Sequence, residues 1–292
     1  MRKLVCLAFV VSSLAPFAAA GQVVPMTERP LVLPEGTGEF AVDLLLGLNK
    51  GAAGKTFGLA TGLASDRYPG VSLAYGVSKR IELGAAFALV YSKDPQYSVG
   101  RRLPGWPPFI GSGTGGTTLV GPVYIWGKLA VAPPLALEVG LVLPGEQFMN
   151  NRAAIRLGVP FKWVFSPGLF SVHVRPDLLL GFAKKGYAAN KDVQVSFYVD
   201  AGATLTLIPE VFLDLSLGYG QALSPSLADL RASTHTTEPA GTGYLPLSFT
   251  VGYTVLPQMD LSLGFTLANL TPGNGRKPAD AKNLTLGGAY RF

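Results

Sequence analysis

The residues whose types and spacing could support chemistry form a row of alternating positions, His173, Arg175 and Asp177. In a β-strand these three side chains would share one face, because successive side chains point to opposite sides. Such a row could polarise a substrate, or it could hold charges in mutual ion pairs. The other histidine, His235, is distant in sequence, and no nucleophile elbow, phosphate-binding loop or dinucleotide fingerprint is present. We therefore expect neither an enzyme nor a metal or cofactor site.

The row belongs to a larger set of ionisable residues placed between apolar neighbours. Because Leu and Val occupy the intervening positions, these charges are predicted to share an inward face of a sheet. Six acids and five bases nearly cancel, which predicts weak ion selectivity if they line a passage, although they could equally form a structural network of pairs. The predicted inward set, with His173 added, is Asp43, Glu82, Lys128, Glu138, Arg156, Lys162, His173, Arg175, Asp177, Asp200, Asp214 and Arg291.

The elements that would position this set are strands with a two-residue hydrophobic period. Between them, short turns containing Lys or Pro alternate with long connections near 50–70, 93–117, 144–152, 183–192, 220–244 and 270–283. An even strand count and this sorting of connections by length are typical of membrane barrels, which carry short turns at one end and long loops at the other. Ten or fourteen strands are alternatives, since 57–63 could form a further strand. The twelve predicted strands are 40–48, 71–77, 81–91, 119–131, 135–143, 155–163, 170–180, 193–207, 211–219, 245–255, 261–267 and 284–292.

The small residues between the apolar positions, chiefly Gly, Ala, Ser and Thr, would lie on the inward face with the charges. Eight strands enclose a filled interior and sixteen to eighteen an open water channel. About twelve strands with a small-residue lining therefore predict a narrow aqueous passage.

Composition supports a membrane barrel. The chain has 292 residues, of which 48% are hydrophobic and 14% charged, against about 25% charged in a typical soluble domain. Beyond the N-terminus no apolar run is long enough for a membrane-spanning helix. The net charge of +6 is scattered, without a basic cluster interleaved with aromatics, so we do not expect nucleic-acid binding.

The N-terminus has the pattern of a secretory signal peptide. A basic start precedes an apolar run, and a small-residue site at 18–20 predicts cleavage near Ala20. The sole cysteine, Cys6, lies in this segment, so the mature chain would carry no disulfide. We predict a signal peptide at 1–20, an extended periplasmic leader with no fold of its own at 21–37, and a barrel at 38–292.

The last strand carries the most informative pattern. Leu284, Leu286, Tyr290 and the terminal Phe292 share one face, opposite small or polar residues. This strand resembles the closing strand of Gram-negative outer-membrane β-barrels, and the wider pattern resembles their small porin-like and transporter-like members. The resemblance implies an all-β, transmembrane, antiparallel up-and-down barrel in the outer membrane. It also implies recognition of Leu284–Phe292 by the barrel assembly machinery.

Three functions remain open at this stage. The first is a channel for passive transport of small solutes. The second is a non-conducting barrel whose long loops bind a surface partner, and the third is a lipid-modifying enzyme using His173. In each case the resemblance implies that outer-membrane lipid would surround the barrel. Lys184, Lys185 and Lys191 in one long connection could contact lipopolysaccharide phosphates, or could be ordinary solvated loop charges.

Overall fold

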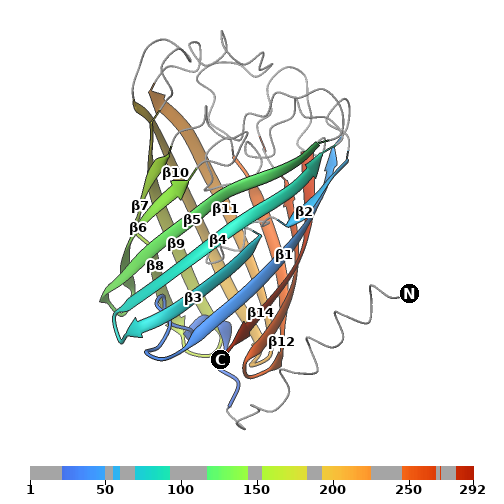
Figure 1. Ribbon diagram of the computed structural model, residues 1–292. Coiled ribbons are helices and arrows are strands. Elements are labelled where there is room, and N and C mark those ends of the chain that lie inside the picture. Colours follow the sequence, from blue (N-terminus) through green and yellow to red (C-terminus); the bar gives the residue numbers. More distant parts are fainter. Residues whose placement is uncertain are drawn as a thin grey trace.

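The computed structural model describes residues 22–49, 55–59, 70–92, 117–143, 153–182, 193–224, 245–267, 270 and 281–292. The signal peptide predicted at 1–20 lies outside these residues. The described part of the chain is almost entirely β-strand and forms a cylinder (Figure 1). Its one short 3-10 helix, η2, spans Met26–Glu28. Across the described ranges, no helix is long and apolar enough to span a membrane.

Fourteen strands are present in the described residues. Six connections between them have two or three residues; the one between β7 and β8 interrupts the wall, and the other five gather at one end of the cylinder, here called the short-turn end. The strands are β1 Gly38–Asn49, β2 Lys55–Leu59, β3 Val71–Ser78, β4 Ile81–Ser92, β5 Thr117–Ala132, β6 Leu135–Leu143, β7 Ala154–Gly158, β8 Phe161–Ser166, β9 Phe170–Phe182, β10 Val193–Ile208, β11 Val211–Ser224, β12 Leu247–Leu256, β13 Met259–Leu267 and β14 Ala281–Arg291.

These strands form a closed ring with twelve antiparallel positions. Two positions are each shared by a pair of short strands: β2 and β3 both pair with β1 and β4, and β7 and β8 both pair with β6 and β9. Each remaining strand fills one position, and the β9–β10 and β1–β14 pairings complete the circle. The predicted twelve-stranded, all-β, up-and-down barrel is therefore confirmed.

The shared positions correct two details of the predicted strands. The connection predicted at 50–70 contains β2, which continues the position of β3 rather than adding another. The strand predicted at 155–163 is interrupted after Gly158. Pro160 lies in the interruption and has no backbone N–H to donate to a neighbouring strand.

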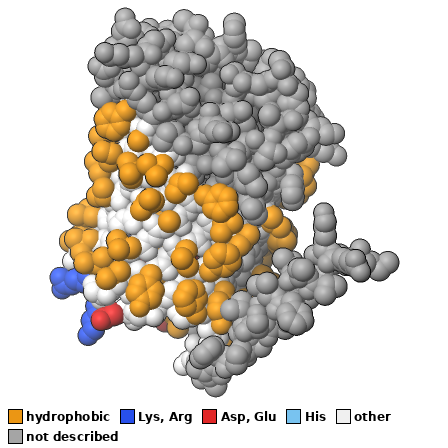
Figure 2. All heavy atoms as spheres, viewed as in Figure 1, with side chains coloured by type: hydrophobic (Ala, Val, Ile, Leu, Met, Phe, Trp, Pro, Cys, Tyr) orange, Lys and Arg blue, Asp and Glu red, His pale blue; other side chains and the backbone are white. Residues whose placement is uncertain are grey.

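Alternation gives the barrel an apolar outer face. In β6 the burial of side chains alternates strictly, and the outward positions are leucine and valine. Neighbouring strands place such residues opposite one another, as in Val251 against Leu263 and Leu263 against Leu286. Leu263 is 57% exposed and Leu286 54%. Figure 2 shows hydrophobic side chains spread over the wall, with charged side chains at its lower edge, as expected of a surface that meets hydrocarbon.

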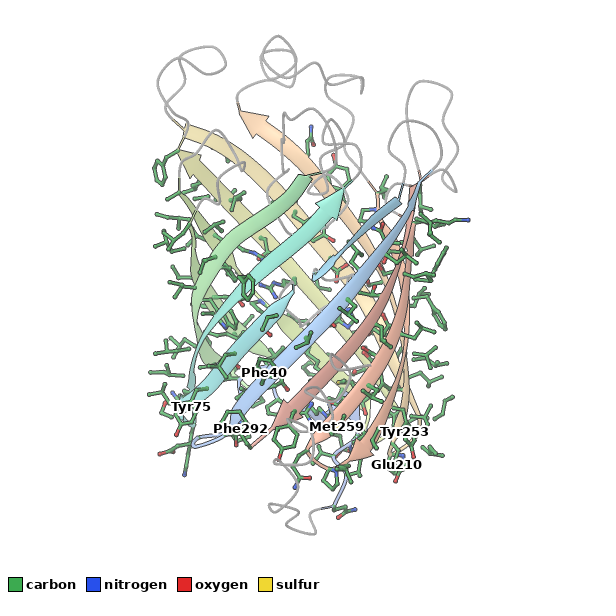
Figure 3. The ribbon with its side chains drawn as sticks, turned by 45° about the vertical axis from the view of Figure 1, so that its right-hand side comes forward. Phe40, Tyr75, Glu210, Tyr253, Met259 and Phe292 are labelled. Atoms are coloured by element: carbon green, nitrogen blue, oxygen red, sulfur yellow. The ribbon has the colours of Figure 1, made fainter. Side chains whose placement is uncertain are left out.

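Aromatic side chains encircle the short-turn end. Phe40, Tyr75, Tyr253 and Phe292 are all exposed there (Figure 3). Trp163, on β8, is exposed as well. Aromatic rings concentrate at the interface between lipid and water, so this girdle is consistent with one boundary of the membrane.

The N-terminal leader lies inside the barrel. Residues 22–37 contain η2, have little other regular structure, and lie against the inner wall at the short-turn end (Figure 1). Thr27 and Val32 are buried, and η2 contacts β9 and β10. The leader therefore occupies this end of the barrel interior.

The outward register predicts a specific stability effect. Leu263 is the middle residue of β13, so the Leu263→Lys variant should lose about 2–4 kcal/mol of unfolding free energy, because a lysine near the midplane must be desolvated. Urea unfolding in phospholipid vesicles, followed by tryptophan fluorescence, would measure it. The Leu263→Met variant, which keeps an apolar side chain, serves as the matched control. Equal stability of the two variants would contradict the register.

Candidate functional site

The polar interior of the barrel is the candidate site. Of the twelve predicted inward residues, eleven are buried, and Arg291 is half-buried at the short-turn end. Their strands turn leucine and valine outward at the intervening positions, so the charges lie on the inner face. That they contact a passing solute remains a prediction. The eleven are Asp43, Glu82, Lys128, Glu138, Arg156, Lys162, His173, Arg175, Asp177, Asp200 and Asp214.

Four of these charges form one buried network across β6, β7 and β9. Arg156 binds Asp177 through two hydrogen bonds of 3.0 and 2.6 Å. Arg175 donates to Glu138 at 2.7 Å and also lies 3.3 Å from Asp177. Glu138 accepts a further bond from the hydroxyl of Tyr124 at 2.5 Å. The two cations thus balance the two anions, which is the arrangement that makes buried charges tolerable.

A second buried pair lies on β4 and β5. One oxygen of Glu82 accepts bonds from Lys128 Nζ and from the indole N–H of Trp126, both at 3.1 Å. The other oxygen accepts a bond from the backbone N–H of Leu33 in the leader. Here the wall and the leader together satisfy one carboxylate. The structural network that the sequence left open as an alternative is therefore present.

The small residues of the inner face do not simply leave space. A Cβ added at Gly84 would lie 2.1 Å from the Trp126 ring, and one at Gly252 would lie 1.9 Å from the Phe212 ring. Gly140 and Gly218 receive Tyr124 and Tyr198 in the same way. The expectation that these positions widen the passage is therefore wrong at each of these glycines, because a neighbouring aromatic ring fills the room.

These inward aromatics were missed by the sequence reasoning. Tyr124 and Trp126 lie on β5 between the outward residues Val123, Ile125 and Gly127. Their register was therefore readable, but the inward face was expected to carry small and charged side chains. The two rings stack with their centroids 5.4 Å apart.

A salt bridge fixes the leader to β13. Arg29 of the leader donates two hydrogen bonds to the fully buried Asp260, at 2.6 and 2.9 Å, and a third to Thr254. Arg291 also pairs with Asp260 and binds Glu39 at 2.9 Å. The sequence offered no signal for this cluster, because Arg29 and Asp260 are 231 residues apart.

Further bonds connect the leader to the opposite wall. Lys162 donates to the backbone carbonyls of Met26 and Arg29, at 2.7 and 3.0 Å. Lys128 donates to the carbonyl of Leu31 at 3.1 Å. The hydroxyls of Thr27 and Thr206 are 3.3 Å apart. The leader is thus bonded to strands around the circumference of the short-turn end.

His173 lies on the inner face between two aspartates. Its Nε2 is 3.9 Å from Asp200 and its Nδ1 is 3.7 Å from Asp214. The predicted row of His173, Arg175 and Asp177 does not form one cluster, because Arg175 and Asp177 belong to the four-charge network. A lipid-modifying site would need to face the bilayer, whereas this imidazole is buried inside the barrel. Within the described ranges, no group of three His, Cys, Asp or Glu side chains could hold a metal ion.

The remaining predicted site residues are at the ends of the chain and in one loop. In β14, Leu286 and Phe292 are exposed, Leu284 and Tyr290 are half-buried, and the rings of Tyr290 and Phe292 stack. Lys184, Lys185, Lys191 and His235 lie outside the described residues, so their predicted roles stay predictions.

The structure is similar to solved outer-membrane channels. An outer-membrane channel from Pseudomonas putida F1 matches with a TM-score of 0.56 and 15% identity, over 93% of this chain and all of that one. The NanC porin matches with a TM-score of 0.51 and 9% identity, over 86% of this chain and all of the porin. No family model matches the sequence, and no curated protein is similar to it. At these identities the likeness establishes the fold alone, a closed antiparallel β-barrel.

The glycine and aromatic packing gives a stability prediction. Gly84→Val should cost about 1–3 kcal/mol, because the added atoms collide with the Trp126 ring. Gly127→Val is the matched control, since its Cβ would meet only Leu83, at 3.4 Å. The measurement is the unfolding midpoint of each variant in detergent micelles. If Gly127→Val proved the more damaging of the two, the packing argument would be refuted.

Proposed function

We propose that this chain is a Gram-negative outer-membrane channel through which small polar solutes pass passively along a narrow interior. The observation that carries the proposal is a closed barrel with an apolar outer face and a charged inner face. An apolar exterior suits hydrocarbon, whereas a charged interior suits water and polar solutes. The similarity in fold to two outer-membrane channels supports the same reading.

Export and insertion would follow from the two ends of the chain. The segment 1–20 would direct secretion and be cleaved near Ala20. The barrel assembly machinery would engage Leu284–Phe292. Support for the second step comes from β14, which pairs with β1 and β13 and turns Leu286 and Phe292 toward the lipid side. The short-turn end would then face the periplasm, and Lys184, Lys185 and Lys191 would be positioned to meet lipopolysaccharide outside.

The leader would set the width of the periplasmic opening. Residues 22–37 are bonded to β5, β8, β10 and β13, so a solute leaving the barrel must pass beside the leader or displace it. The aromatic rings that fill the glycine positions narrow the interior further. We therefore propose passage of small molecules rather than of large ones.

The leader and the aromatic rings that occupy the interior favour one alternative, a non-conducting barrel that acts through its long loops. The candidate loops at 93–117 and 220–244 lie mostly outside the described residues. Planar-bilayer recording of the purified mature chain separates the two functions. A channel is expected to give discrete current steps, whereas a silent bilayer from correctly folded protein would favour the alternative.

A leader variant tests the proposed periplasmic constriction. Arg29→Gln removes the charge that binds Asp260, and the loss of a charged hydrogen bond typically costs about 1.5–3 kcal/mol. The leader should then leave the opening more often. In single-channel recordings, the variant is expected to show larger open-state currents, or more frequent openings, than the wild-type protein.

Arg80→Gln is the control for this experiment. Arg80 is exposed in the β3–β4 turn at the same end of the barrel, so its loss removes the same charge without touching the leader. If Arg29→Gln and Arg80→Gln gave indistinguishable current levels, the leader would not control the opening.

A further inference from the structure

The contacts between the leader and the inner wall are those of a bound peptide. Buried lysines of the wall bind the backbone of the leader rather than its side chains. Lys162 on β8 donates to the carbonyls of Met26 and Arg29, at 2.7 and 3.0 Å. Lys128 on β5 donates to the carbonyl of Leu31 at 3.1 Å. Bonds to the main chain hold a peptide without reading its sequence.

The same kind of recognition continues on β3 and β4. Glu82 accepts a bond from the backbone N–H of Leu33 at 2.9 Å. The carbonyl of Gly76 accepts a bond from the N–H of Gly36 at 2.8 Å. A Cβ added at Gly76 would lie 2.1 Å from the carbonyl oxygen of Pro34. The leader backbone can therefore approach the wall this closely only because the wall residue is glycine.

One side chain of the leader is recognised specifically. Arg29 donates two hydrogen bonds to the fully buried Asp260 and a third to Thr254. The planar fork of a guanidinium matches a carboxylate, whereas a lysine would present all its donors from a single nitrogen. The wall is therefore built to hold an arginine at this point of the bound segment.

The leader has a backbone suited to this kind of binding. Apart from η2 it is not helical, so most of its N–H and C=O groups are not used within a helix. Pro25, Pro30 and Pro34 restrict its conformation, and Arg29 has the extended angles φ −63° and ψ 135°. Proline-containing segments of this kind lose little conformational entropy when they bind.

We propose that the inner wall at the short-turn end is a binding site for a largely non-helical, proline-containing peptide that carries an arginine, and that the leader is its tethered occupant. Because most of the bonds go to the main chain, another peptide can satisfy them if it places an arginine beside Asp260. Such a peptide reaches the site from the short-turn side, which faces the periplasm in the proposed function. The expectation that a bound peptide narrows the opening deepens the proposed channel function and rests on it.

The binding test uses a fluorescently labelled synthetic peptide with the sequence of residues 22–37 and the full mature chain in detergent micelles. In the wild-type protein the tethered leader competes for the site at an effective concentration of roughly millimolar order. In the Arg29→Gln protein this competitor has lost its charged hydrogen bonds. Fluorescence anisotropy should therefore show at least about tenfold tighter binding of the free peptide to Arg29→Gln than to wild type.

A second peptide that carries Arg29→Gln is the matched control, and it requires no change in the barrel. It should bind the Arg29→Gln protein at least about tenfold more weakly than the arginine peptide. Adding Asp260→Asn to the protein should abolish this difference. Asp200→Asn should preserve it, because Asp200 precedes the leader contact at Thr206 by six residues on β10. If Asp260→Asn does not fold, Thr254→Ala takes its place, with a smaller reduction of the difference.

Conduction is recorded separately in a planar bilayer that contains Arg29→Gln channels. The arginine peptide, added on the short-turn side, should return their currents toward the wild-type level. The glutamine peptide at the same concentration should leave them unchanged. Specific binding of the arginine peptide without any change in current would overturn the link between the site and the opening.

The remaining outcomes distinguish the two proposals. A conducting protein that binds the two peptides equally, or binds neither, would overturn the peptide site and leave the channel standing. A silent protein that prefers the arginine peptide, and loses this preference in Asp260→Asn, would support the site and overturn the channel. A preference that survives in Asp260→Asn, or that Asp200→Asn removes equally, would place the effect in the general charge of the interior and overturn the site.

Discussion

Backbone hydrogen bonding around a closed ring is the constraint on which the rest of this structure depends. Hydrocarbon offers no partner for a peptide group, so an open sheet edge could not face lipid. The ring is completed where β9 meets β10 and where β14 meets β1, and the terminal Phe292 exchanges two backbone bonds with Gly38. Once the ring is closed, alternation along each strand necessarily sends one set of side chains to the lipid and the other set inside.

The interior solves the resulting packing and charge problem in two ways. Charged side chains that enter it are mostly paired, as in Arg156 with Asp177, because an isolated buried charge is costly. Bulky rings such as Trp126 are accommodated by glycines on the neighbouring strand. The His173 imidazole is accommodated in the same way, since it lies against Gly202, and Asp200 and Asp214 flank it at 3.9 and 3.7 Å.

The barrel itself was predictable from sequence because the two-residue period is a local property that every strand repeats. The inward register of Glu138 followed directly, since this residue lies between the outward residues Leu137 and Val139. The finer errors had local causes as well. Pro160 divides one predicted strand, and β2 was read as part of a long connection, although it continues the position of β3. Which inward charges pair with which was not readable, because those partners lie on different strands.

The sequence by itself determined the architecture, the two faces of the wall and the alternation of short turns with long connections, because each depends on a periodicity along the chain. Only the tertiary structure decided what fills the interior. It brought Arg29 to Asp260, placed the Trp126 ring against Gly84, and left His173 between two aspartates. The physical reason is that ring closure brings together strands far apart in sequence, and those contacts depend on strand register and barrel radius rather than on any local pattern.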